Sequence, residues 1–195
     1  DLVMPLRGLD KDNILRPDTT LEKLATLKPA FDKRSGNGTL TAGNSTNLSD
    51  GASAALLSSE AWAQANGKEI QAYLVDAQVA AVDFVAGEGL LMAPAWAVAQ
   101  LLKRNNLKLQ DFDFYEIHEA FAAQVLCTLK AWESEEFCKT KLGMDGALGS
   151  IDRSKLNVVG SSLALGHPFA ATGARIVATA AKLLKEKGQG RVLIS

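Results

Sequence analysis

Residues 156–175, LNVVGSSLALGHPFAATGAR, predict a strand, a turn and a helix in succession. The apolar, β-branched run at 156–159 is typical of a short strand, and the glycine and serine residues that follow end it. Pro168 stands where proline is favoured, in the first turn of a helix. His167 is therefore expected at a helix N-terminus.

A helix N-terminus favours an uncharged imidazole. The helix dipole repels positive charge there, so we expect His167 to stay neutral near pH 7. A neutral imidazole can accept a proton or donate an N–H to an oxyanion, which suits acid/base catalysis. A capping or packing role is the plainer alternative, and this stretch by itself does not separate the two.

Composition sets the class of protein. The 195 residues are 47% hydrophobic and 22% charged, enough for one globular α/β domain or for part of a larger one. The net charge of -1 offers no basic field for nucleic acid, and the longest apolar run, at 90–102, is too short and too interrupted to span a bilayer. We expect a soluble protein with neither a nucleic-acid partner nor a transmembrane segment.

The two cysteines, Cys127 and Cys138, show no metal-ligand spacing, which favours free thiols in a reducing compartment over a disulfide scaffold. Cys127 lies among apolar residues of a predicted helix and is expected in the core. Cys138 lies in a polar segment without signs of activation. Neither is predicted to be a nucleophile.

Along the chain, strands and helices are expected to alternate. Helices are predicted over 20–27, 60–66, 93–105 and 119–132 and after Pro168, and strands over 39–41, 70–82, 112–117, 157–161 and 191–194. We expect loop and cap material before residue 39 and a polar, glycine-containing insertion at 134–153. This alternation indicates an α/β fold with helices covering a sheet that has some parallel neighbours.

A polar turn follows the predicted strand at 39–41. The glycine, asparagine and aspartate residues between Gly43 and Gly51 require tight turns packed against other backbone. Such a turn either presents backbone groups to a ligand or serves as a structural connection, and both interpretations remain open.

The two histidines of the chain, His118 and His167, stand in the same kind of place. Each follows a predicted strand and opens a predicted helix, and ligands of open α/β sheets bind beyond the carboxyl ends of strands.

A metal site formed by the two histidines is the competing hypothesis, but no carboxylate or cysteine motif completes a zinc site. Glu119 could act as an acid/base, although dipole and capping chemistry is ordinary for it.

Three segments resemble motifs of the thiolases. GSSLALGHPFAATGAR is similar to their histidine motif, and IHEAFAAQ to their Asn-Glu-Ala-Phe motif, with His118 where many members have asparagine. TLTAGNSTNLSDGASAALL resembles their Ala-Gly-Asn…Asp-Gly-Ala segment. The order and spacing agree over essentially the entire chain. The histidine at 118 is most similar to degradative 3-ketoacyl-CoA thiolases (acetyl-CoA C-acyltransferases), including β-subunits of trifunctional complexes.

The resemblance implies a thiolase-like layered α/β fold, with a mixed β-sheet and helices on both of its faces. Residues 1–58 would be the loop region and last strands of the N-terminal thiolase half. Residues 59–195 would be the C-terminal half, truncated before its Cys-x-Gly loop. Members usually assemble as dimers or tetramers, and a multifunctional β-oxidation partner subunit is a further candidate partner. The cytoplasm is the expected compartment, with the mitochondrial matrix as the alternative.

The resemblance also implies roles for site residues. His167 would activate a nucleophilic cysteine and help bind the thioester oxygen, and His118 would hold a water that completes this oxyanion site. Thr46 would contact the pantetheine arm of coenzyme A, and the turn containing Gly160 and Gly166 would line the coenzyme A side. No metal or resident cofactor is expected, since coenzyme A thioesters are the substrates.

The implied reaction transfers an acyl group between acyl-CoA and acetyl-CoA, by thiolytic cleavage of a 3-ketoacyl-CoA or by Claisen condensation in fatty-acid β-oxidation. An enolate formed from a thioester needs donors at its oxygen, typically worth ~3 kcal/mol each, and a thiolate needs a neighbouring base. Neither family cysteine lies in this chain, so the chain alone is expected to be inactive. The alternative is a non-catalytic acyl-CoA-binding, lipid-binding or assembly module of the same fold.

Overall fold

The structure is a computed structural model that describes residues 4–195. In order along the chain, its elements are α1 (Leu21–Ala25), α2 (Glu60–Ala65), α3 (Ala93–Asn105), β1 (Phe114–Glu116), α4 (Ala122–Glu133), α5 (Glu135–Thr140), the 3-10 helix η1 (Arg153–Lys155), α6 (Ser162–Leu165), α7 (Ala170–Lys187) and β2 (Val192–Ile194).

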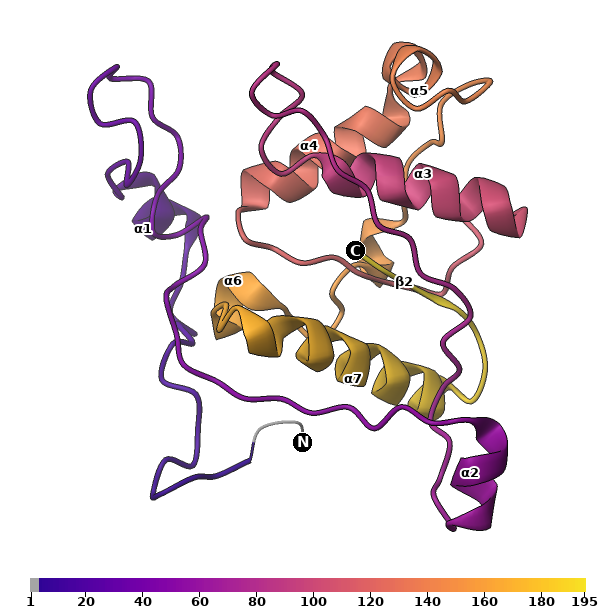
Figure 1. Ribbon diagram of the computed structural model, residues 1–195. Helices are drawn as coiled ribbons and strands as arrows, with labels where there is room; N and C mark the ends of the chain where they lie inside the picture. The colour runs from indigo at the N-terminus through magenta and orange to yellow at the C-terminus, as the bar shows by residue number, and fades with distance from the viewer. Residues whose placement is uncertain (1–3) are drawn as a thin grey trace.

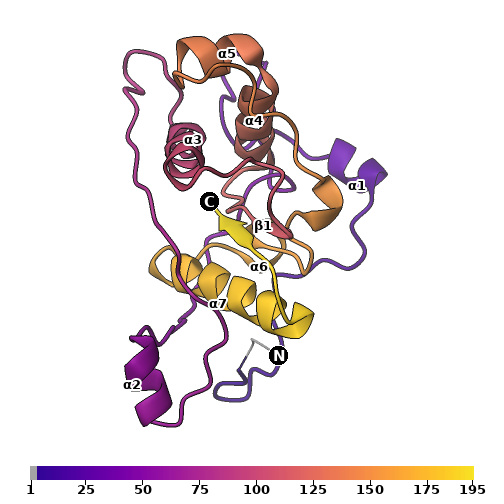
Figure 2. The ribbon, with the colours of Figure 1, turned by 90° about the vertical axis from the view of Figure 1, so that its right-hand side faces the viewer.

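Two parallel strands form the centre of the fold. β1 and β2 pair in register, with Tyr115 opposite Leu193. Helices α3 and α4 lie on one side of this pair and α7 on the other, which Figures 1 and 2 show from two directions. Helices on both faces confirm the predicted α/β class.

Alternation along the strands divides their side chains between the two faces. Tyr115 and Leu193 join the core cluster with residues of α3 and α4, and both are at most 3% exposed. The neighbouring Glu116 is also fully buried, on the strand face opposite to Tyr115. The sheet thus carries an apolar core on one side and a buried carboxyl group on the other.

The predicted helix at 93–105 is confirmed by α3. Its buried residues recur at the spacing of one helix face, as Ala95, Val98, Ala99 and Leu102. The helix ends at Asn106, whose φ of 51° is left-handed, a common helix stop. Burying Leu102 stabilises the fold by about 2 kcal/mol.

The long helix predicted after Pro168 is confirmed by α7, which spans 18 residues and ends at Gly188 with a φ of 85°. The short helices predicted near 20–27 and 60–66 are also present as α1 and α2. The hydroxyls of Thr20 and Ser59 accept hydrogen bonds from backbone N–H groups three residues on, as N-caps do. Local sequence signals therefore placed these helices correctly.

The strand predicted over 70–82 is wrong. Its apolar residues alternate as in a strand, but among residues 4–195 no strand pairs with this segment. Tyr73, Val75 and Val79 are 63–87% exposed. An extended segment becomes a β-strand only when a neighbouring strand forms hydrogen bonds with its backbone N–H and C=O groups. The alternating sequence pattern gave no information about such a neighbour.

The strand predicted over 39–41 reduces to a single bridge between Thr41 and Pro29. The strand predicted over 157–161 is wrong, since only Leu156, just before it, forms a bridge, with Tyr115. After Leu156 the chain turns, because Asn157 has a left-handed φ of 47°. The predicted helix at 119–132 begins only at Ala122, and the insertion at 134–153 contains α5 and η1.

The structure reverses the expected positions of the cysteines. Cys127 is exposed, since it lies on the face of α4 opposite to the buried face that contains Val125 and Leu129. Cys138 is 0% exposed, and its Sγ lies 3.4 Å from the carbonyl oxygen of Trp132. Packing of α5 against the end of α4 therefore buries the thiol that sequence placed in a polar segment.

Within the part of the chain that the structure describes, no helix combines the length and the apolar character that crossing a membrane would need.

Candidate functional site

The two histidines lie against each other. The ring centroids of His118 and His167 are 4.3 Å apart, and their planes are inclined by 52°. His118 lies two residues after β1, and His167 lies three residues before α7. The fold thus brings together two imidazoles that are 49 positions apart in the sequence.

The end of β1 is held firmly on both sides. The backbone N–H of His118 donates to the carbonyl oxygen of Ser195 at 2.7 Å, which continues the ladder to β2. On the other side the side chain of Asn157 takes the place of a strand. Its Nδ2 donates to the carbonyl oxygen of Ile117, and its Oδ1 accepts from the backbone N–H of Ile117, both at 2.9 Å. The position of His118 is therefore fixed by backbone pairing.

The ring of His118 is held through Nδ1, which lies 2.9 Å from the Ser162 hydroxyl. The same hydroxyl accepts a hydrogen bond of 2.8 Å from Nη2 of Arg175. Burial, then the neighbouring His167 and the Arg175 charge, lower the pKa of His118 from 6.5 to about 4. His118 is therefore neutral at pH 7.

His167 is held by the loop before it and by α7. Its backbone N–H donates to the carbonyl oxygen of Asn47 at 3.3 Å, and its Nδ1 lies 2.7 Å from the hydroxyl of Thr172. Phe169 covers the ring at 4.8 Å between centroids. Phe169 is 70% exposed, and its positive φ of 24° is a strained conformation for a bulky residue.

The polar turn that contains Thr46 meets both histidine loops. The N–H of Thr46 donates to the carbonyl oxygen of Ala120 at 3.0 Å, and the N–H of Ala122 donates to Asn44 at 2.9 Å. One residue beyond Thr46, Asn47 accepts from His167 as described above. The three sequence motifs therefore converge on one place in the fold.

The two glycines proposed for this site differ in their surroundings. Gly166 is buried with a φ of 87°, and a Cβ at this position would collide with the Ser49 side chain and approach Ile14 Cδ1 to 2.9 Å. Gly160 is exposed, and a Cβ there would meet nothing within 4 Å. Position 166 requires glycine because the Ser49 and Ile14 side chains leave no space for a Cβ. Position 160 requires it only because its φ is 83°.

Glu119 orients the loop beside the site. One of its carboxylate oxygens accepts from Asn157 Nδ2 at 2.6 Å and the other from the backbone N–H of Leu163 at 3.1 Å. Both oxygens are thus occupied by structural hydrogen bonds. This geometry favours the structural interpretation of Glu119 over an acid/base role.

A second carboxyl group, that of Glu116, lies at the end of β1, two residues before His118. Glu116 is 0% exposed, and neither of its carboxyl oxygens has a hydrogen-bond partner. Burial raises the pKa of Glu116 from 4.5 to about 7, with the Arg175 charge opposing the rise and Glu119 adding to it. Sequence analysis missed Glu116, although a carboxylate inside an apolar strand was a visible signal.

Other contributing residues were also missed: Asn157, Ser162, Thr172 and Arg175. Each is polar and lies within the two motif loops or on α7. No spacing rule links them to a histidine, because their contacts depend on how α6 and α7 pack beside β1.

The described residues form no cluster of metal-ligating side chains. Within residues 4–195, no group of three or more His, Cys, Asp or Glu side chains is arranged to hold a metal ion. Cys127 and Cys138 belong to α4 and α5, neither of which carries a histidine.

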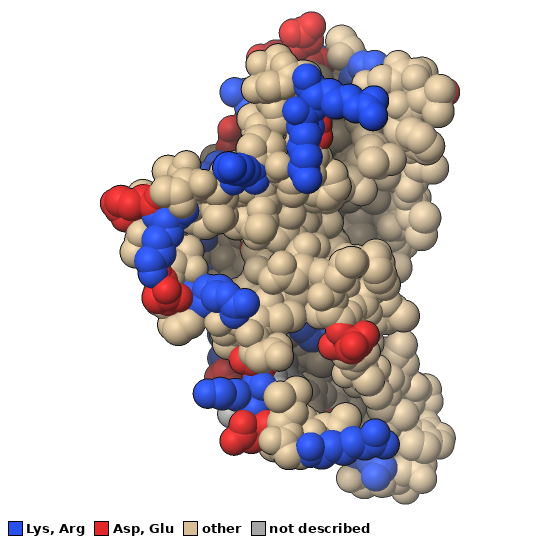
Figure 3. Space-filling model, turned by 90° about the vertical axis from the view of Figure 1, so that its left-hand side faces the viewer, with Lys and Arg blue, Asp and Glu red and all other residues tan. Residues whose placement is uncertain are grey.

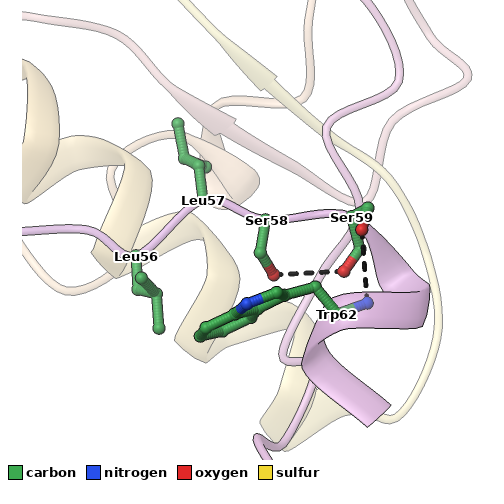
Figure 4. A pocket seen from close by; sticks show the side chains of 5 residues that line it. All are labelled: Leu56, Leu57, Ser58, Ser59 and Trp62. Atoms are coloured by element: carbon green, nitrogen blue, oxygen red, sulfur yellow. Dashed lines mark hydrogen bonds between the residues drawn. The ribbon is translucent and has the colours of Figure 1, made fainter. Parts of the chain in front are cut away.

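A shallow pocket occurs beside α2, lined by Leu56, Leu57, Ser58, Ser59 and Trp62 (Figure 4). Its hydrogen bonds are those of a helix start, in which Ser59 accepts from the N–H of Trp62 at 3.2 Å. The lining includes no side chain that titrates near neutral pH. The pocket is therefore not a candidate for the chemistry.

Charge does not mark a binding face on the side of the molecule in Figure 3. There basic and acidic side chains are intermingled, and a broad area between them is uncharged. This distribution agrees with the net charge of -1. The histidine pair remains the strongest candidate for a site.

Comparison with known proteins places these motifs in context. The family described as "Thiolase, C-terminal domain" matches residues 68–195, and "Thiolase, N-terminal domain" matches residues 6–61. The chain is 46% identical over 182 residues to the 3-ketoacyl-CoA thiolase of Shewanella loihica, covering 93% of this chain and 41% of that protein.

Solved structures agree. The Bacillus anthracis acetyl-CoA acetyltransferase is 37% identical with a TM-score of 0.74, covering 95% of this chain and 41% of that one. Human mitochondrial 3-ketoacyl-CoA thiolase is 30% identical with a TM-score of 0.73, covering 94% and 41% of the two chains. The chain thus spans about two fifths of the length of these relatives.

Proposed function

Because this chain belongs to the thiolase family, we propose that it carries the histidine part of an acyl-transfer site. The reaction moves an acyl group between acyl-CoA and acetyl-CoA, by thiolytic cleavage of a 3-ketoacyl-CoA or by Claisen condensation, as in fatty-acid β-oxidation. The observation that carries the proposal is the contact between His118 and His167, with ring centroids 4.3 Å apart.

The geometry suits the chemistry of a thioester enolate. Such an enolate is stabilised by N–H donors at its oxygen, each typically worth ~3 kcal/mol, and a neutral His118 can donate directly or through a water. His167 serves as the base for a cysteine thiol and as a second donor. The reactive thiols belong outside this chain in our proposal, since Cys127 and Cys138 lie on helices without a histidine.

Coenzyme A is proposed to bind beside this pair. Thr46 is a candidate contact for the pantetheine arm, because its N–H bonds to Ala120 in the loop that follows His118. Gly166 and Gly160 are proposed to line the same side, and the lack of space for any side chain at 166 beside Ser49 keeps this position a glycine next to His167. Assembly as a homodimer or tetramer and a cytoplasmic location are further proposals.

A chimera tests the catalytic roles. The segment of the Shewanella loihica relative that aligns with this chain, 41% of that protein, is replaced by the chain, and thiolysis of acetoacetyl-CoA is measured. We expect activity, a loss of about 1,000-fold for His167→Ala and a loss of about 100-fold for His118→Ala. Cys127→Ser is the matched control and should leave the rate unchanged.

Binding tests the chain itself. Titration calorimetry of the 195-residue chain with acetyl-CoA should show binding that Thr46→Val weakens about tenfold. A folded chimera that binds acetyl-CoA but does not catalyse thiolysis would favour the non-catalytic binding module instead. A chimera whose activity survives both histidine substitutions would contradict the assigned roles.

A further inference from the structure

Three side chains form a row that begins in the candidate site, at His118, and continues through Ser162 to Arg175. Arg175 on α7 donates from Nη2 to the hydroxyl of Ser162 on α6, at 2.8 Å. That hydroxyl lies 2.9 Å from Nδ1 of His118, two residues after β1. Three separate elements therefore meet at one serine oxygen.

The protons in this row can be assigned by elimination. A guanidinium group can only donate, so Ser162 Oγ is the acceptor in its bond with Arg175. Ser162 is 0% exposed, which leaves no water to receive its own proton. Within the described residues its other hydrogen-bond partner is His118 Nδ1. The hydroxyl therefore donates to Nδ1, and a neutral imidazole that accepts at Nδ1 carries its proton on Nε2.

We propose that Ser162 and Arg175 are positioning residues that hold His118 in the tautomer with the proton on Nε2. This inference rests on the proposed function, since it states which atom of His118 serves the thioester oxygen or its bound water. His118 is thereby a fixed hydrogen-bond donor. An imidazole free to exchange tautomers would present a lone pair to the oxygen part of the time.

The charges around the ring support the same arrangement. His167 faces His118 from the loop before α7, and Arg175 lies on the second turn of that helix; both disfavour a positive charge on His118. Burial lowers the pKa of Arg175, and Glu116 on β1 and Glu119 after it oppose this effect electrostatically. A doubly protonated ring would also aim Nδ1–H at Ser162, whose hydroxyl would lose its acceptor. Neutrality and the tautomer are thus maintained by the same contacts.

Nuclear magnetic resonance tests the tautomer in the unaltered chain. The 195-residue chain labelled with ¹⁵N-histidine contains only two imidazoles, and the His167→Gln variant is needed only to assign their signals. Long-range ¹H–¹⁵N correlations at pH 7 show which ring nitrogen carries the proton. We expect a single His118 form protonated at Nε2. A main form protonated at Nδ1 would overturn the proposal, because the serine would then be an acceptor.

Variants test which contact fixes the form. In Ser162→Ala the minor Nδ1–H form of His118 should rise about tenfold, as expected for the loss of one hydrogen bond. Arg175→Met should raise the pKa of His118, because the Arg175 charge lowers it. Ser161→Ala is the matched control: this neighbouring serine is 2% exposed and approaches Arg175 at 3.4 Å, and its loss should leave the tautomer unchanged. Equal effects of both serine variants would contradict a specific role for Ser162.

Activity measurements distinguish a failure of the positioning inference from a failure of the proposed function. In the chimera, Ser162→Ala should lower kcat about tenfold with an unchanged KM for coenzyme A. A rise in KM with an unchanged kcat would refute a positioning role. If the chimera is active and depends on His118 while the ring is protonated at Nδ1, the positioning inference fails and the proposed function stands. If the chimera is folded and inactive while the Nε2 form is found, the function fails and the tautomer assignment stands.

Discussion

Glu116 makes a prediction that can be worked out from the structure. Its carboxyl group is 0% exposed and unpartnered, and burial raises its pKa from 4.5 to about 7. The folded protein therefore binds this proton more tightly than the unfolded chain does. The resulting stability is fully present below pH 4.5 and is lost as the pH rises through about 7. At ~1.36 kcal/mol per pKa unit, the loss amounts to about 3 kcal/mol.

His118 acts in the opposite direction. Its pKa falls from 6.5 to about 4, so its contribution is present above pH 6.5 and is lost as the pH falls through about 4. The two groups nearly cancel between pH 4.5 and 6.5, which would hide each effect in the unaltered protein. Glu116→Gln removes one of them and keeps the shape of the side chain.

Urea unfolding of Glu116→Gln, followed by tryptophan fluorescence at several pH values, isolates the carboxyl group. We expect the variant and the unaltered protein to be about equally stable at pH 4.5, and the variant to be more stable by about 3 kcal/mol at pH 8. Glu136→Gln removes an exposed carboxylate from α5 and serves as the control. A stability difference for Glu116→Gln that stays constant from pH 4.5 to 8 would refute the reasoning.

Three further predictions concern the supports of the site. Asn157→Asp should destabilise the fold by about 3 kcal/mol in urea unfolding. The variant replaces the Nδ2 donor, which bonds to the carbonyl oxygen of Ile117 and to the Glu119 carboxylate, with an acceptor. A change under about 0.5 kcal/mol would contradict the role of Asn157 in replacing a neighbouring strand. Gly166→Ala should cost about 3 kcal/mol and Gly160→Ala only about 1 kcal/mol, since both have positive φ but only the first lacks space for a Cβ; equal losses would refute the packing argument. A thiol reagent should label Cys127 rapidly in the folded chain and Cys138 only on unfolding, and mass spectrometry of the labelled peptides would expose the reverse order.

The helices show what local signals can predict. α3 and α7 follow the spacing of their buried residues, and α1 and α2 begin at the hydroxyl caps of Thr20 and Ser59. These signals act within a few residues of one another, so one sequence suffices to recognise them. Strands depend on distant partners, which is why the alternating segment 70–82 was predicted as a strand and is not one.

The candidate site divides in the same way. The positions of His118 and His167 after predicted strands indicated that both would face the region where ligands bind, and the structure places their rings 4.3 Å apart. Nothing in the local sequence indicated that Ser162 and Arg175 would support His118, or that packing of α5 would bury Cys138.

The amino-acid sequence by itself determined α1, α2, α3 and α7, the hydroxyl caps of α1 and α2, the α/β class and the two histidine loops, because propensity and periodicity act over neighbouring residues. Only the tertiary structure decided the strand partners, the burial of Glu116 and the hydrogen bonds of His118. These depend on which distant segments exclude water from one another, and burial is what turns a side chain's ordinary chemistry into a shifted pKa or a fixed proton.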